Sequence, residues 1–337
     1  MPTSLTEPWT LGSLRVPNRV LLAPLAGIGN WFVRLQAKRF GAGMAVSEMV
    51  SSHAIHYRNE KTCTEMLRID PREREHGPVA IQLFGEDPAM MRSAAAHVAA
   101  VGADAIDINM GCPVPKVRKT GAGAALLDDP DRAVEVARAA VEGGGGLPVT
   151  VKLRSGLRPG EESGFRLAHR LVAEAGVSAI GFHPRSAAVH HKGRPDYELA
   201  ARLVRSLPAP VVLTGGLNDA SAVRDAFATT GAAAVMLARG ALGNPWLFSE
   251  LLGDEPDVPS HAEVLAELDW TIERAVEHLG EGRATRYLRK FYPWYVPRLG
   301  LEPSDAKRLQ ETLQTAERLG QVRELLGLSC GAVAPAG

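Results

Sequence analysis

The fold of this chain is decided by residues 78–113, which read PVAIQLFGEDPAMMRSAAAHVAAVGADAIDINMGCP. Short apolar runs at 79–83 and 105–109 flank an amphipathic segment at 88–101. Apolar runs of this length are typical of strands that are buried on both faces, and the segment between them has helical spacing. The stretch therefore predicts a strand, a helix and a second strand, joined by a right-handed crossover.

The same unit repeats on both sides of this stretch. Further strands are expected at 20–25, 44–49, 149–153, 179–183, 211–214 and 233–237, and further helices at 131–142, 165–175, 198–206 and 220–229. Residues 50–78 are more polar and fit neither pattern clearly. Eight strands that alternate with helices favour an α/β fold of the (β/α)8 TIM-barrel type. A doubly wound sheet is less favoured because no GxGxxG motif follows the first strand.

Beyond Trp246 the strand pattern stops. Residues from about 259 to 328 show helical periodicity, and Ser260 and Glu263 have the spacing of a capping box. Ser304 is expected to cap a later helix. The chain is thus expected to contain a catalytic barrel at 1–250, a helical domain at 259–328 and a flexible tail at 329–337.

Composition narrows the class of protein. The 337 residues carry 38 basic and 38 acidic side chains, so any surface that binds nucleic acid must be local. Cys63, Cys112 and Cys330 form no CxxC pair, and His190 and His191 lack a third ligand, so no metal site is expected. The chain shows no signal-peptide pattern and no apolar run near the ~20 residues of a membrane span. These features predict a cytoplasmic enzyme.

Polar residues gather where the predicted strands end. Barrel enzymes place their chemistry at the carboxyl ends of the strands and in the loops that follow. Residues from at least five strands are therefore expected to converge on one rim: Gln82, Asp107, Asn109, Cys112, Lys152, Arg154, His183, Thr214 and Arg239.

The last two strand ends predict a bound phosphate. Gly215 and Gly216 follow the seventh strand, and Arg239 and Gly240 follow the eighth. Glycines let backbone N–H groups approach an anion, and a guanidinium suits phosphate. The alternative is that these glycines only form tight turns. It is less favoured because the two loops should be adjacent in this fold.

Three rim residues are candidates for the chemistry. Lys152 could form a Schiff base, supply a fixed positive charge beside an anionic cofactor, or pair with a carboxylate such as Asp107, and the sequence does not separate these roles. Cys112 lies in a Gly–Cys–Pro turn and suits a general acid or a nucleophile better than an inert buried thiol. His183 is a second acid–base candidate.

These motifs resemble the signature of the tRNA-dihydrouridine synthases. The resemblance covers residues 10–328 and is strongest in Asn109-Met110-Gly111-Cys112-Pro113, followed by Lys116, Lys119 and Gly121-Ala122-Gly123. The bacterial B-type branch is the most similar. The order of the other motifs agrees: Pro24-Leu25-Ala26, Gln82-Leu83-Phe84-Gly85, Val151-Lys152-Leu153-Arg154, His183 and Arg239-Gly240-Ala241.

The resemblance implies an enzyme that uses FMN, with NADPH as reductant, to reduce the C5=C6 bond of a uridine in tRNA. It implies Cys112 as the proton donor and Asn109 as a contact of the uracil. It also implies an FMN site in the barrel, formed by Pro24, Leu25, Ala26, Gln82, Lys152, His183, Thr214, Gly215, Gly216, Ala238 and Arg239.

The chain departs from the family pattern at several of these positions. Thr214-Gly215-Gly216 replaces Asn-Gly-Asp, and Ala238 replaces a glycine, which affects the expected phosphate contacts. After His183 the family's Gly, Arg, Gln and Tyr are replaced by Pro184, Ala187, Val189 and His191.

Residues 283–298 offer a local surface for RNA in the helical domain. They contain Arg283, Arg286, Arg289, Lys290 and Arg298, no acid, and interleaved aromatic side chains. Such a segment suits contact with the RNA backbone and stacking on bases, so Arg286, Arg289 and Lys290 are expected to contact tRNA. The alternative is a solvated basic face over aromatic side chains that pack in a helical core.

Three other functions fit part of the pattern. The first is an FMN-dependent dehydrogenase of the dihydroorotate or dihydropyrimidine type, which acts on a free pyrimidine. The second is a flavin-free aldolase that uses Lys152, and the third is an RNA-binding protein without activity. The basic helical segment favours a large substrate over the first, and flavin absorbance distinguishes the flavin enzymes from the other two.

Overall fold

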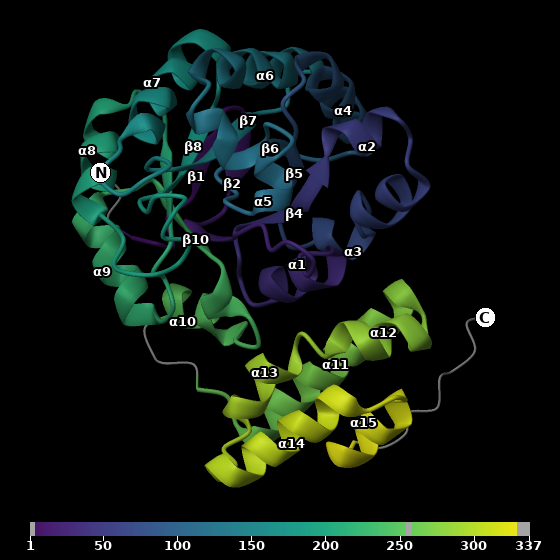
Figure 1. The fold of residues 1–337 in the computed structure, drawn as a ribbon. Coiled ribbons are helices and arrows are strands. Elements are labelled where there is room, and N and C mark those ends of the chain that lie inside the picture. The colour runs from purple at the N-terminus through teal and green to yellow at the C-terminus, as the bar shows by residue number, and fades with distance from the viewer. Residues whose placement is uncertain (1–3, 254–257, 329–337) are drawn as a thin grey trace. The chain divides into compact units, whose positions relative to one another are not determined.

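The structure is a computed structural model that describes residues 4–253 and 258–328, so the predicted tail at 329–337 lies outside the described residues. Its first part is a closed barrel of parallel strands (Figure 1). The strands follow one another in chain order, and the last pairs with the first: β3 (Val20–Leu22), β4 (Met44–Ser51), β5 (Val79–Phe84), β6 (Ala105–Met110), β7 (Val149–Arg154), β8 (Ala179–His183), β9 (Val211–Thr214) and β10 (Ala234–Leu237). The predicted (β/α)8 barrel is confirmed.

Helices surround the barrel, and aspartates set where five of them begin. Asp70, Asp87, Asp129, Asp196 and Asp219 each accept a hydrogen bond from an N–H of the first helical turn, as N-caps do. The helices of this part are α1 (Trp31–Arg39), α2 (Ser52–His56), α3 (Pro71–Arg74), α4 (Pro88–Ala100), α5 (Pro115–Arg118), α6 (Pro130–Gly143), α7 (Ser163–Ala175), α8 (Tyr197–Ser206), α9 (Ala220–Thr230) and α10 (Trp246–Leu252), with short turns η1 (Thr62–Met66), η2 (Gly123–Leu127) and η3 (Arg239–Ala241).

A short antiparallel hairpin, which was not predicted, precedes the barrel. It consists of β1 (Trp9–Leu11) and β2 (Leu14–Val16). Trp9 and Val16 belong to one buried cluster with alanines at the starts of the strands, such as Ala105 and Ala179. The hairpin therefore packs at the amino ends of the strands, which leaves the carboxyl ends for the chemistry.

Two stretches differ from the prediction. Strand β3 ends at Leu22 rather than at residue 25, because Pro24 has no N–H to donate to a ladder. The unassigned stretch 50–78 contains α2, η1 and α3, which are too short to leave a periodic pattern in the sequence.

The remaining described residues form a second, helical unit, to which the segment Leu242–Trp246 also belongs. Its elements are α11 (His261–Leu279), α12 (Glu281–Leu288), α13 (Tyr292–Tyr295), η4 (Val296–Arg298), α14 (Pro303–Thr315) and α15 (Leu319–Leu325). The Ser260–Glu263 capping box is confirmed. The prediction for Ser304 is wrong, since α14 begins at Pro303, whose fixed φ favours the first helical position. None of the described helices is long and apolar enough to cross a membrane.

Candidate active site at the carboxyl ends of the strands

The register of the barrel brings the predicted polar residues side by side. Gln82 of β5 pairs with Asp107 of β6, and Asn109 pairs with Lys152 of β7. Because side chains alternate along a strand, Asp107 and Asn109 lie on the same face of β6. Polar groups from neighbouring strands therefore meet inside this end of the barrel.

Four buried side chains form a chain of hydrogen bonds there. Thr150 and Gln82 both donate to the carboxylate of Asp107, Gln82 through Nε2 over 2.6 Å. Asn109 Nδ2 donates to Gln82 Oε1 over 3.0 Å. Burial raises the pKa of Asp107 to about 6. Asp107 was expected at this rim with Lys152 as a possible partner, but the sequence did not predict its bonds to Gln82 and Thr150, because residue types do not reveal which side chains meet across strands.

The backbone around Cys112 is held from two directions. Asn109 Oδ1 accepts hydrogen bonds from the N–H groups of Gly111, at 3.2 Å, and Cys112, at 2.8 Å. The carbonyl of Cys112 accepts from the N–H of Ala124 at 3.0 Å. The thiol itself is free and half-buried. Asn109, which we expected to contact uracil, thus uses its oxygen to hold the Cys112 turn, and its Nδ2 donates to Gln82 Oε1 and, over 3.8 Å, to the sulfur of Met49.

Lys152 is a cationic residue beside this turn whose charge no other described residue pairs with. Within the described part of the chain, its ammonium group has neither a hydrogen bond nor an ion pair, so the alternative of an ion pair with Asp107 is not observed. Burial, and then the charge of Arg154, lower the pKa of Lys152 to about 8. Gly181 on the neighbouring strand lacks a side chain where the stem of Lys152 passes. An anionic ligand would satisfy this ammonium group.

His183 is an uncharged residue of the site. It is buried, and burial together with the positive charges of Lys152, Arg154 and Arg185 lowers its pKa far below the usual range. Arg185 Nη1 lies 3.3 Å from His183 Nε2. Because a guanidinium only donates, Nε2 must be the acceptor and the ring hydrogen lies on Nδ1. His183 therefore suits a hydrogen bond to a ligand better than proton donation from an imidazolium.

The loops after β9 and β10 lie against each other, as a shared phosphate site requires. A Cβ on Gly240 would lie 2.7 Å from the carbonyl oxygen of Leu217. Gly215 and Gly216 have φ values of +98° and +81°, which favour glycine. A Cβ on Gly215 would lie 2.4 Å from His183 Nε2, so this backbone approaches the imidazole closely.

Arg239 provides the charge of this loop pair. Its side chain is exposed and has no hydrogen bond or ion pair with any of the residues that the structure describes. Burial, and then the charge of Arg239, lower the pKa of His191 to about 4, so the two side chains are near each other. Arg239 is therefore available to a phosphate.

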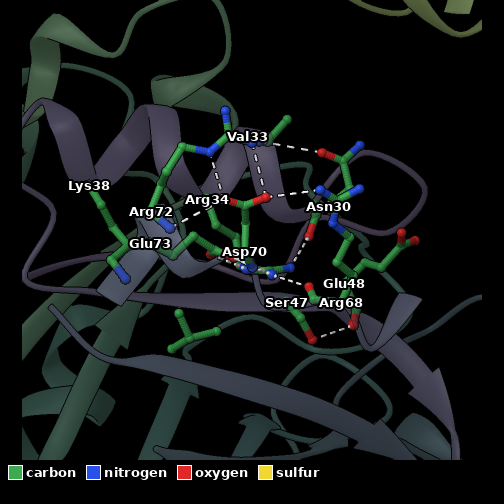
Figure 2. A network of polar contacts seen from close by, with 12 residues as sticks. Asn30, Val33, Arg34, Lys38, Ser47, Glu48, Arg68, Asp70, Arg72 and Glu73 are labelled. Atoms are coloured by element: carbon green, nitrogen blue, oxygen red, sulfur yellow. Dashed lines mark hydrogen bonds and ion pairs between the residues drawn. The ribbon is translucent and has the colours of Figure 1, made fainter. Parts of the chain in front are cut away.

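An ion pair buried from solvent lies behind the first loop of the rim (Figure 2). Arg34 of α1 donates from Nε and Nη2 to the two carboxylate oxygens of Glu73 in α3, at 2.8 and 2.9 Å. Both side chains are 0% exposed. Nothing in the sequence predicts this pair, because its members are 39 positions apart and no motif connects them.

This ion pair supports the loop that contains the predicted flavin residues. Arg34 Nη1 donates to the carbonyl of Gly29 at 3.2 Å, and that carbonyl also accepts from the N–H of Glu48. The Glu48 carboxylate accepts from the N–H of Gly27 at 2.8 Å. The turn that follows Pro24, Leu25 and Ala26 is therefore fixed from α1 and β4.

Within the helical unit, the basic segment divides into exposed and packed side chains. Arg286 and Lys290 are exposed, and Trp294 is 36% exposed. Arg289 differs: its Nη2 donates to the carbonyl of Ala316 at 2.9 Å, so this guanidinium stabilises the unit itself.

The aromatic side chains of the segment divide in the same way. Phe291, Tyr292 and Tyr295 are buried, so for these three the packed alternative is correct. The Tyr287 ring lies 4.8 Å from Lys290 Nζ, close enough for a cation–π contact.

Comparison with known proteins identifies the family. The sequence model described as "Dihydrouridine synthase (Dus)" matches residues 21–326. A probable tRNA-dihydrouridine synthase of Rhodobacter capsulatus is 37% identical over 300 residues, which cover 85% of this chain and 89% of the relative. The tRNA-dihydrouridine synthase B of Pseudomonas aeruginosa is 34% identical over 313 residues, which cover 90% and 92%.

Solved structures of lower identity share the barrel. Morphinone reductase in complex with tetrahydroNAD matches with a TM-score of 0.57 at 17% identity, over 78% of this chain and 94% of that one. 2-Naphthoyl-CoA reductase matches with a TM-score of 0.62 at 14% identity, over 75% and 52%. These likenesses concern the fold, whereas the sequence relationship extends through barrel and helices alike. This chain therefore belongs to the dihydrouridine synthase family.

Proposed function

We propose that this protein is a tRNA-dihydrouridine synthase that binds FMN, takes electrons from NADPH and uses Cys112 as its proton donor. The observation that carries the proposal is the pairing of Asn109 with Lys152. Asn109 holds the Cys112 turn, and Lys152, whose ammonium group has no partner among the described residues, lies on the adjacent strand. A thiol beside a positive charge supports a proton donor next to an anionic ligand.

The described residues fit FMN at both of its ends. Arg239 and the close backbone of Gly215 and Gly216 suit the phosphate, with Thr214 and Ala238 at the same strand ends. Lys152, neutral His183 and the remaining N–H of Gln82 suit the ring system, with the loop of Pro24, Leu25 and Ala26 beside them. Among the residues that the structure describes, the ammonium of Lys152 and the guanidinium of Arg239 have no hydrogen-bond or ion-pair partner, which supports this assignment.

The chemistry divides between cofactor and protein. Bound FMN, once reduced by NADPH, would supply the hydride for C6 of the uracil ring. Cys112 gives its proton to C5, which completes the saturation of the C5=C6 bond. The thiolate that remains takes a proton from water for the next cycle. Asn109 fixes Cys112 through the two backbone N–H groups that it accepts.

The substrate base must leave its stack to reach this site, at a cost of a few kcal/mol. Exposed Arg286 and Lys290 are proposed as contacts of the tRNA backbone, and the helical domain at 259–328 as its binding domain. Arg289 is the weakest of the three predicted contacts, because Ala316 already binds its guanidinium.

The experiment that tests the proposal is the mapping of dihydrouridine in tRNA from cells that lack this gene. One or more dihydrouridines should be missing and should return when the wild-type gene is supplied. Reduction of free uracil or a free pyrimidine acid by the purified protein, with an unchanged tRNA profile, would instead favour the free-pyrimidine dehydrogenase.

Purified protein is expected to release FMN, rather than FAD, on denaturation. Arg239→Ala should weaken FMN retention about 10- to 100-fold, because a charge-assisted contact with phosphate contributes ~1.5–3 kcal/mol. Dialysis followed by flavin fluorescence measures this. Arg166→Ala, an exposed arginine on outer helix α7, is the control and should retain FMN normally. Equal retention in both variants would remove Arg239 from the phosphate site.

The double variant Arg286→Gln/Lys290→Gln should bind tRNA more weakly and with a flatter salt dependence. Each lost phosphate contact reduces the slope of log K against log salt by roughly 0.7–0.9. Arg15→Gln/Arg166→Gln removes two exposed charges from hairpin β1–β2 and from α7, so it controls for net charge. Filter binding over a salt series measures both slopes. Identical slopes would assign Arg286 and Lys290 to a solvated face.

A further inference from the structure

Arg154 is a buried cation that has no role in the proposed reaction. Its side chain lies at the end of β7 and is 3% exposed. No carboxylate of the described residues pairs with it, and burial lowers its pKa to about 10. Burying a charge without a counter-ion costs stability unless other polar groups compensate.

Backbone carbonyls of two different loops provide this compensation. Arg154 Nε donates to the carbonyl of Gly111 at 3.0 Å. Its Nη1 donates to the carbonyls of Ser186, at 3.0 Å, and His190, at 2.7 Å. Gly111 precedes Cys112 in the loop after β6, whereas Ser186 and His190 belong to the loop after β8. One guanidinium thus bridges two loops that are far apart in the sequence.

We infer that Arg154 is a positioning residue that holds the Cys112 turn against the loop after β8. The inference rests on the proposed function for its catalytic consequence, but the link between the loops stands independently. Asn109 accepts from the N–H of the Gly111–Cys112 peptide, and Arg154 donates to the carbonyl of the same peptide. The next peptide is held by Ala124, whose N–H donates to the Cys112 carbonyl. Without Arg154 the Gly111–Cys112 peptide keeps only its bond to Asn109, so the turn that carries the thiol is held less firmly.

The loop after β8 is strained where Arg154 holds it. His190 has a φ of +52°, in the left-handed region that costs a residue with a side chain. The next ring, His191, lies nearly parallel to His183, with 6.1 Å between centres. The contact from Arg154 to the His190 carbonyl stabilises this conformation and therefore the place of His191. The Cys112 turn and the loop after β8 therefore both depend on the guanidinium of Arg154.

Arg154→Met tests the link, because methionine preserves much of the volume and removes all the donors. Hydrogen exchange of the full-length protein, followed by mass spectrometry, should show faster exchange in residues 111–127 and in residues 184–193. A lost hydrogen bond contributes about 1 kcal/mol, so protection should fall roughly fivefold in each segment. Exchange in β5 and β9 should stay unchanged. Change in neither segment, or in only one, would overturn the inference.

Arg185→Met is the matched control. Arg185 is also a buried arginine, but it donates to the Gly193 carbonyl within the loop after β8 and not to the Cys112 turn. Loss of the Arg185 guanidinium should speed hydrogen exchange in residues 184–193 and leave exchange in residues 111–127 unchanged. If both variants expose both segments, the effect of Arg154 is general destabilisation rather than a specific link.

Arg154→Lys keeps the positive charge, but its single ammonium group cannot reach all three carbonyls. This variant replaces Arg154→Met in the exchange experiment if the methionine variant does not fold. Exchange should become faster in the same two segments, but with a smaller loss of protection.

A kinetic experiment with tRNA tests the consequence for catalysis. Saturating turnover should fall about 10-fold or more in Arg154→Met, while reduction by NADPH stays normal, since misplacing a proton donor slows the chemical step. Hydrogen exchange needs no tRNA, so a failure of the proposed function leaves this test intact.

Discussion

Cys112→Ala is expected to slow reoxidation of the reduced enzyme by tRNA about 10²–10⁴-fold, the usual cost of losing a positioned proton donor. FMN binding and reduction by NADPH should remain normal, because neither step requires a thiol. The substitution replaces only the sulfhydryl group by hydrogen, and Asn109 and Ala124 continue to hold the backbone, so the turn should keep its conformation. Stopped-flow absorbance measures both half-reactions separately.

Two comparisons make this experiment decisive. Cys112→Ser should restore little activity, because an alcohol is a far weaker acid than a thiol. Cys63→Ala, at the other free cysteine among the described residues, should behave like the wild type. Reoxidation by tRNA at the wild-type rate in Cys112→Ala would remove Cys112 from the mechanism, and the absence of any flavin half-reaction would favour the aldolase.

Arg34→Met is expected to lower the free energy of unfolding of the barrel by about 3–5 kcal/mol, because it leaves the carboxylate of Glu73 buried without its partner. Glu73 also accepts from the N–H of Asp70, but that bond alone does not compensate a buried charge. Urea denaturation at neutral pH measures the loss. FMN retention should fall as well, since Arg34 supports the carbonyl of Gly29.

The double variant Arg34→Met/Glu73→Met distinguishes an ion pair from simple packing. Removing both charges replaces a buried pair by apolar side chains, which is often nearly neutral for stability. The double variant should therefore be more stable than Arg34→Met alone. If the loss of unfolding free energy in the double variant equals the sum of the losses in the two single variants, each side chain contributes independently and the ion pair itself adds nothing.

The barrel was predictable because its signal is local. Each buried strand and each amphipathic helix follows from a few consecutive residues, and the chirality of parallel crossovers leaves few ways to connect them. Strand ends then indicated where Gln82, Asn109, Lys152 and His183 would lie. Elements with a weak local pattern were missed, such as hairpin β1–β2 and the short helices α2 and α3.

The sequence by itself thus determined the barrel, the family and the identity of the rim residues, because periodicity and motif order are properties of neighbouring positions. Only the tertiary structure decided what those residues do to one another. It shows that Asn109 holds the Cys112 turn, that Lys152 has no partner among the described residues, and that Arg154 bridges two loops. Hydrogen bonds of this kind depend on register and on distances across strands, and no local pattern in a single sequence encodes them.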